Sequence, residues 1–149
     1  MNVSKPIFEE RLSPSVSIVL ALSLSGPMVL LSALPFGTTL AFTLAVVVPV
    51  SLIAGAFALS PVIRVDQSFT RGNMSLPLDV LGEAEIFEGE NARLERGPKL
   101  DARARLAIRG DVDPVVKIQV KDELDPTPYI LVSTRKPKEL VAALRADRA

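Results

Sequence analysis

The chain of 149 residues contains neither cysteine nor histidine. The absence of cysteine excludes disulfides, a thiolate nucleophile and zinc-thiolate sites. The absence of histidine removes the commonest general base and the usual transition-metal ligand. We therefore expect no catalytic, cofactor-binding or metal site, and we expect a protein that is not an enzyme.

Net charge is also lacking, because 17 acidic residues balance 17 basic ones. A balanced chain does not provide the one-signed basic surface that binds nucleic acid, so we expect no nucleic-acid partner. The charges are unevenly placed, since none lies between Ser13 and Ile63. This gap accounts for an apolar fraction of 48% and a mean hydropathy of +0.34, both high for a soluble domain.

The uncharged gap predicts a transmembrane hairpin at residues 15–60. A helix needs roughly 20 residues to cross a bilayer, so the gap accommodates two spans. Leu34-Pro35-Phe36-Gly37-Thr38 provides the break between them, because proline lacks an amide hydrogen and glycine permits a sharp turn. We predict helices near residues 15–34 and 38–59, preceded by a cytoplasmic segment at residues 1–14.

A cleaved signal peptide is the main alternative for the first span, because Lys5 and Arg11 precede it and Ser32-Ala33 are small residues near its end. Leu31 fits such a cleavage site poorly, and the second span would still anchor the chain. With Arg64 and Arg71 after the second span, the basic residues predict that both termini are cytoplasmic.

Small residues predict close packing of the two helices, with candidates at a spacing of four: Ser17, Ala21 and Ser25 in the first, Ser51 and Gly55 in the second. Pro27 and Pro49 lie within the spans and are expected either to kink them or to shape a hinge or pocket. Neither span contains an ionisable residue, which argues against an ion or proton pathway.

From residue 61 onward the pattern predicts a small antiparallel β-domain. Alternation of apolar and polar residues indicates strands near 63–66, 74–78, 83–87, 105–109 and 116–121, with a central strand at 129–132. The stretch from 88 to 102 has no clear assignment. A helix is expected to start at Pro137, because Glu139 suits its first turn and Leu140, Val141 and Leu144 form an apolar stripe.

Two local patterns resemble chemical sites. Ser133 and Lys136 match the S-x-x-K motif of serine acyl-transfer enzymes, but the accompanying motifs are missing and Pro137 disfavours helix at the lysine. We therefore interpret Ser133 and Thr134 as hydroxyls that satisfy backbone groups at a strand-to-helix joint. The acidic runs at 111–113 and 122–125 lack the pattern of a calcium loop and are expected to be solvated turns.

With these elements placed, the chain resembles the bacterial membrane-protein family DUF3093. The matching segments are Glu10-Arg11-Leu12 with Pro14, Ile63-Arg64-Val65-Asp66, Leu76-Pro77-Leu78 and the stretch from Asp125 to Pro137. The resemblance implies a two-span protein of the bacterial cytoplasmic (inner) membrane with a cytoplasmic domain, and it implies no activity. The strand order and final helix of residues 61–149 are also similar to bacterial PH-like domains.

The expected fold is thus a membrane α+β protein, with an N-terminal transmembrane hairpin and a PH-like domain closed by a C-terminal helix. We expect a membrane-anchored, non-enzymatic interaction or scaffold protein whose partners are the lipid bilayer and a protein. The alternative is an accessory subunit of a transport or lipid-handling assembly. Arg135, Lys136 and Lys138 are the candidate contacts with a membrane surface or a partner.

Overall fold

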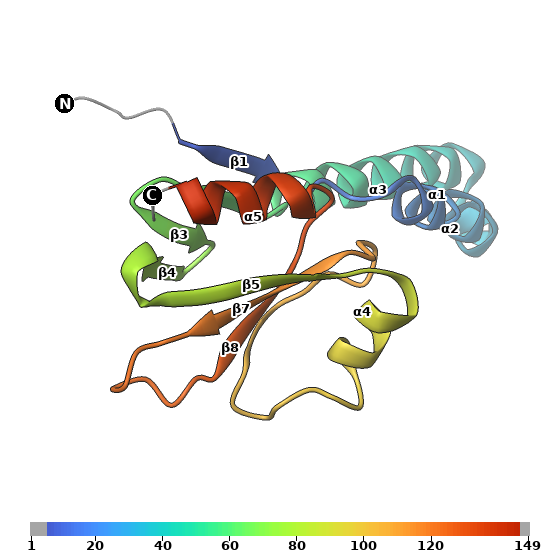
Figure 1. Ribbon diagram of the computed structural model, residues 1–149. Helices are drawn as coiled ribbons and strands as arrows, with labels where there is room; N and C mark the ends of the chain where they lie inside the picture. The colour runs from blue at the N-terminus through green and yellow to red at the C-terminus, as the bar shows by residue number, and fades with distance from the viewer. Residues whose placement is uncertain (1–5, 147–149) are drawn as a thin grey trace. The chain divides into compact units, whose positions relative to one another are not determined.

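A computed structural model describes residues 6–146 and divides the chain into two compact units (Figure 1). One unit is helical and contains residues 13–60. The other is an α/β unit formed by the described residues before Ser13 and after Ser60. Lys5, used above for orientation, lies outside the described residues.

The helical unit is a hairpin whose first arm is interrupted. Its elements are α1 (Val16–Ser23), α2 (Ser25–Ala33), a short 3₁₀ turn η1 (Leu34–Phe36) and α3 (Thr38–Ala58). The turn ends at Gly37, whose φ of 126° is open to glycine. The break between α1 and α2 falls at Leu24, because Pro27 has no amide hydrogen for the Ser23 carbonyl. The predicted break at Pro35 and Gly37 is confirmed, whereas the predicted helix 15–34 is divided.

Small residues are buried between the arms, but the predicted ones are not the most buried. Gly26, Ala33 and Ala41 are buried in the hairpin. Of the predicted residues, Ser25 and Gly55 are half-buried, and the other three are exposed. A Cβ added to Gly26 would lie 3.0 Å from the Ala45 carbonyl oxygen, so only glycine permits this approach without a shift of α3. Spacing alone did not show which face of each helix meets the other.

The two arms are long and apolar enough to cross a membrane. The apolar stretches run over Val16–Phe36 and Thr38–Ala58. In the most apolar 18 residues of each stretch, only 11% and 6% are buried, respectively. Helices at the core of a soluble domain are mostly buried, so these arms do not have that role here.

The α/β unit contains two four-stranded sheets. In spatial order, the first is the antiparallel meander β1 (Phe8–Arg11), β2 (Val62–Val65), β3 (Ser68–Arg71), β4 (Met74–Pro77). A 3₁₀ turn η2 (Leu78–Val80) leads to the second sheet. Its spatial order is β5 (Leu81–Phe87), β7 (Val115–Val120), β8 (Tyr129–Ser133), β6 (Arg105–Ala107). Two helices complete the unit: α4 (Gly89–Arg96) and α5 (Pro137–Ala146).

Most predicted strands and the C-terminal helix are present, with small shifts at their ends. Three features differ. The strand expected near 63–66 is followed by a further strand, β3, which was not predicted, and the chain folds back between them where the Ser68 amide donates to Asp66 Oδ1 at 3.0 Å. The unassigned stretch contains α4. The second sheet is not purely antiparallel, because β6 pairs with β8 in parallel.

The N-terminal segment also differs from the expected organisation, in which residues 1–14 stood apart from the domain. Phe8–Arg11 forms β1 and pairs along β2, with Glu10 opposite Ile63. The Leu12 amide donates to the Pro61 carbonyl at 3.0 Å, so the two points where the chain leaves and re-enters the unit are adjacent. The hairpin is therefore an insertion between the first two strands of the α/β unit.

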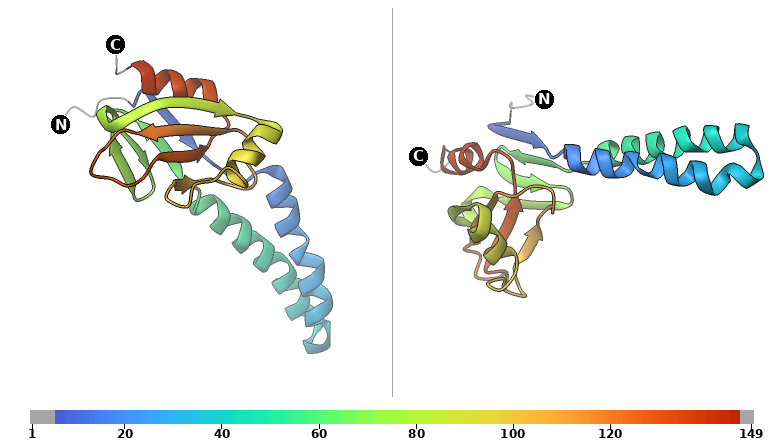
Figure 2. Two further views of the ribbon diagram at one scale, coloured as in Figure 1. Left: turned by 60° about the horizontal axis from the view of Figure 1, so that its bottom comes forward. Right: turned by 90° about the vertical axis from the view of Figure 1, so that its right-hand side faces the viewer.

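Both sheets and α5 enclose the main core. Its largest fully buried side chains include Phe69, Ile63, Ile118, Leu140 and Leu144. Burial of each such side chain contributes roughly 1.5–3 kcal/mol. A smaller cluster under α4 joins Ala92, Val115, Tyr129 and Leu131. Figure 2 shows α5 lying along one side of β5.

Candidate functional site

The three predicted contact residues are exposed and have different neighbours. Arg135 Nη2 lies 3.6 Å from Asp111 Oδ2, and Lys136 Nζ lies 3.1 Å from Glu139 Oε2. Lys138 lines a hollow shared with Arg145 at the other end of α5. The structure thus gives these side chains three different surroundings.

Ser133 and Lys136 of the S-x-x-K motif also do not converge. Ser133 is fully buried at the end of β8, where its Oγ accepts from the Arg109 amide at 2.9 Å. Lys136 is exposed, and its amide donates to Thr134 Oγ1 at 3.0 Å. These hydrogen bonds confirm that the hydroxyls satisfy backbone groups at the joint between strand and helix.

A polar cluster, buried or half-buried except for the Arg135 side chain, surrounds this joint, and the sequence did not reveal it. We call it the joint cluster and define it as Glu10, Arg71, Arg109, Asp111, Thr134 and Arg135. The carboxylate of Glu10 accepts a hydrogen bond from the Thr134 hydroxyl and another from the Arg135 amide, the latter at 3.0 Å. Strand β1 is thereby tied to a segment more than a hundred residues later in the chain.

Arg109 makes the second connection within the joint cluster. Its Nε lies 2.8 Å from Asp111 Oδ1 and its Nη2 lies 3.3 Å from Asp111 Oδ2, a bidentate arrangement. Its Nη1 donates to the Leu12 carbonyl. The last residue before the helical unit is therefore held by a charged side chain of the α/β unit.

Arg71 is the member of the joint cluster that has a buried donor without a hydrogen-bond partner. It is 9% exposed, and its Nη1 has no hydrogen-bond partner among residues 6–146. Burial, together with the nearby charge of Arg109, lowers the pKa of Arg71 to about 10, while Glu10 acts in the opposite direction. Arg71 thus remains charged at neutral pH, and Glu10 is the acidic group that offsets it.

A second charged group lies under α4. Lys117 Nζ donates to Glu95 Oε2 at 2.9 Å and lies 4.4 Å from the centroid of the Tyr129 ring. The hydrogen bond to Glu95 raises the pKa of Lys117. Tyr129 Oη in turn accepts from the Asp101 amide at 2.8 Å. A lysine held in its charged form is unsuited to act as a base, so the arrangement is structural in character.

The acidic runs are occupied by arginine and backbone donors. Asp113 accepts from the Gly89 amide at 2.7 Å and from Arg96 at 3.2 Å, and Asp125 pairs with Arg105 at 2.8 Å. Within residues 6–146, no three acidic side chains are grouped so that they could hold a metal ion.

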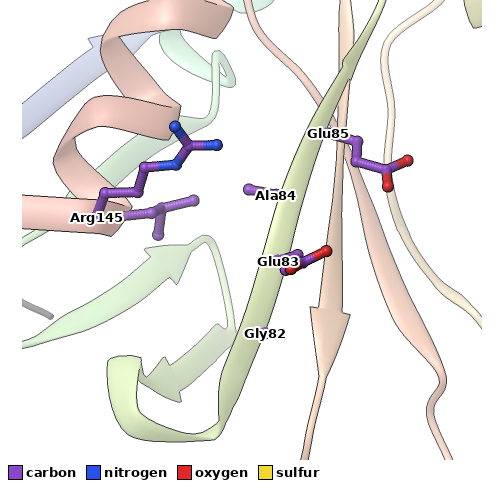
Figure 3. Close-up of a pocket in the computed structure, with 6 residues that line it drawn as sticks. Gly82, Glu83, Ala84, Glu85 and Arg145 are labelled. Atoms are coloured by element: carbon purple, nitrogen blue, oxygen red, sulfur yellow. The ribbon is translucent and has the colours of Figure 1, made fainter.

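A concave surface of the α/β unit lies between β5 and α5 (Figure 3). One hollow of about 420 Å³ is lined by Gly82, Glu83, Ala84, Glu85, Leu144 and Arg145. A second of about 370 Å³ is lined by Ala84, Ile86, Lys138, Val141, Ala142 and Arg145. Because Ala84 and Arg145 belong to both, the hollows form one surface, which we call the β5–α5 groove.

The helical unit has a groove of its own, of about 500 Å³. Its lining includes both intrahelical prolines, Pro27 and Pro49, together with Gly26 and Ala45. The sequence thus identified two residues of this groove, although it did not show that they meet.

The comparisons with known proteins cover nearly the whole chain. Residues 7–144 match the family described as "Protein of unknown function (DUF3093)". No curated protein and no solved structure matches the chain significantly. The chain belongs to the DUF3093 family.

Proposed function

We propose that this is a membrane-anchored, non-enzymatic interaction or scaffold protein of the bacterial cytoplasmic membrane. The observation that carries the proposal is the pair of apolar arms, whose side chains are almost entirely unburied, inserted into a folded α/β unit. Such an apolar surface requires lipid or protein around it. The α/β unit then provides the surface that meets a partner.

The proposed topology has two spans, with the α/β unit and both termini in the cytoplasm. Arg11 and Arg64 support this topology. Arg11 lies just before the first span and Arg64 just after the second, and basic residues favour the cytoplasmic side. Close packing of Gly26 against α3 supports retention of the first span rather than its cleavage as a signal peptide. The two sheets and C-terminal helix are compatible with the proposed PH-like fold.

The non-enzymatic part of the proposal is supported by the pairing of the buried polar groups. Ser133, Lys117 and Glu10 all have hydrogen-bond partners, and none lines the β5–α5 groove. Side chains that are paired in this way and lie away from the groove do not reach a substrate held in it.

The test is recovery of a partner from native membranes. The tagged full chain is cross-linked in intact membranes, solubilised and purified, beside a control in which residues 13–60 alone carry the tag. We expect one or more proteins to be enriched reproducibly with the full chain and not with the hairpin. Equal recovery from both would contradict an interaction role for the α/β unit.

An accessory subunit of a transport or lipid-handling assembly is the second candidate. The observation in its favour is the groove that contains both Pro27 and Pro49. Native mass spectrometry of the full chain with added lipid is expected, in that case, to show a retained lipid that a Gly26→Leu variant loses. Absence of any retained lipid at saturating concentration would contradict this candidate.

A further inference from the structure

Strand β5 is an edge strand of the second sheet. Among the described strands it pairs only with β7, and its more exposed stretch from Glu83 to Phe87 is longer than β1, β4 or β6, the other edge strands. An exposed edge offers backbone groups to which an extended peptide can add as a further strand. The β5–α5 groove runs along this strand.

The side of β5 that faces α5 is apolar. Ala84 and Ile86 alternate on this side, and Ile86 remains 36% exposed. Helix α5 contributes Val141 and Ala142 to the same hollow. Because side chains of a strand alternate between its faces, every second residue of an added strand would enter these hollows.

The helix side of the groove is basic. Lys138 and Arg145 are exposed, line the hollows and form no ion pair with any residue in the described range. They are two helical turns apart, roughly 10 Å along the axis. Residues four apart in an extended chain share one face and lie roughly 13 Å apart, a difference that the long, flexible side chains of lysine and arginine can span. Figure 3 shows Arg145 on the Ala84 side of the strand, while Glu85 projects from the opposite side.

We propose that the β5–α5 groove binds an extended segment of a partner protein, added to β5, in which acidic side chains flank an apolar one on the face toward α5. The apolar side chain fills the hollow beside Ala84 and Ile86, and the acidic side chains pair with Lys138 and Arg145. This inference rests on the proposed interaction function and specifies its surface and the chemistry of its partner.

The test uses the full chain in nanodiscs of zwitterionic lipid and two labelled peptides. The first is Ser-Glu-Thr-Val-Thr-Glu-Ser, which places two glutamates and a valine on one face; the second has lysine in place of both glutamates. We expect the acidic peptide to bind more tightly by fluorescence anisotropy. It should also slow amide hydrogen exchange in β5.

Charge neutralisation provides the matched comparison. Lys138→Gln combined with Arg145→Gln is expected to weaken binding of the acidic peptide about five- to tenfold, since each exposed ion pair contributes modestly. Arg93→Gln, on the exposed surface of α4, is expected to leave it unchanged. Glutamine retains helix propensity at all three positions.

Failure to bind the acidic peptide, or equal binding of both peptides, would overturn the inference. Slower exchange in β5 and α5 on adding anionic lipid without peptide would assign the groove to the bilayer and overturn it as well. If the double variant still recovers the same cross-linked partner as the native chain, this groove is excluded while the interaction function stands. If the native chain recovers no partner, the proposed function itself fails.

Discussion

Glu10 shows how much one buried carboxylate contributes when its partners come from three parts of the chain. It accepts hydrogen bonds from Thr134 and Arg135 and provides the acidic charge near Arg71. A buried charge is tolerated only when it is paired and hydrogen-bonded, so these contacts depend on one another. We infer that the joint cluster determines whether β1 remains attached to the α/β unit.

Glu10→Gln is expected to lower the free energy of unfolding by about 3 kcal/mol, because it leaves the buried Arg71 without the acidic charge that offsets it. The measurement is denaturant unfolding of the purified full chain followed by circular dichroism. Glu9→Gln is the matched control, since Glu9 is exposed and its pair with Arg64 at 3.3 Å is a surface one. We expect it to change stability by less than about 0.5 kcal/mol. Similar losses in both variants would contradict a special role for Glu10.

Lys117 leads to a prediction about pH. Its hydrogen bond to Glu95 raises its pKa above the usual 10.5, so its stabilising contribution is complete below 10.5 and is lost as pH rises through the folded-state pKa. The difference in unfolding free energy between the native chain and Lys117→Met should therefore be constant below pH 10.5 and shrink as pH rises above it. If this difference in unfolding free energy stayed constant above pH 10.5, the hydrogen bond to Glu95 would not raise the pKa of Lys117.

At the scale of elements, β1 and β2 are one structural unit separated by an inserted hairpin. Because Leu12 and Pro61 are hydrogen-bonded neighbours, a short linker can replace residues 13–60. We expect residues 6–12 joined to 61–146 through a four-residue Gly-Ser linker to fold and to unfold cooperatively. Residues 61–146 alone lack Phe8, Glu10 and Leu12, and should show no cooperative transition.

Heteronuclear NMR spectra of the two fragments would check this prediction. Dispersed amide resonances from the linked fragment and collapsed ones from residues 61–146 are the expected result. If residues 61–146 alone gave a dispersed, native-like spectrum, β1 would be dispensable, and the chain would be better divided as the sequence first suggested.

Some of these elements could be predicted from the sequence and others could not. Strands such as β7 were predictable because Val116, Ile118 and Val120 alternate with polar residues. Helix α4 was not, because its first turn is fixed by a distant side chain, with Asp113 accepting from the Gly89 amide. The parallel pairing of β6 with β8 likewise depends on contacts between segments far apart in the chain.

Of the candidate sites, too, one could be predicted from the sequence and another could not. The hydroxyl joint at Ser133 and Thr134 was predictable from local chemistry, since a strand end precedes a proline that begins a helix. The joint cluster was not, because its members come from β1, β3, the loop after β6 and the segment between β8 and α5. One signal was present: Phe8, Glu10 and Leu12 share a face of a two-residue repeat, which places a carboxylate between two buried apolar residues.

The proposed arrangement of the whole chain depends on a membrane around the apolar arms. The apolar arms have no other burial within the described chain, and the basic residues that flank them favour one orientation. We therefore propose a two-span hairpin whose turn lies on the far side of the cytoplasmic membrane from the α/β unit, which lies in the cytoplasm.

Cysteine accessibility tests this claim most directly, because the native chain has no cysteine and provides a blank background. Thr38→Cys lies at the hairpin turn and Ala102→Cys lies on the exposed surface of the α/β unit. In intact spheroplasts, a membrane-impermeant maleimide is expected to label Thr38→Cys, and to label Ala102→Cys only after lysis. Labelling of both positions in intact spheroplasts, or of Ala102→Cys alone, would contradict the proposed topology.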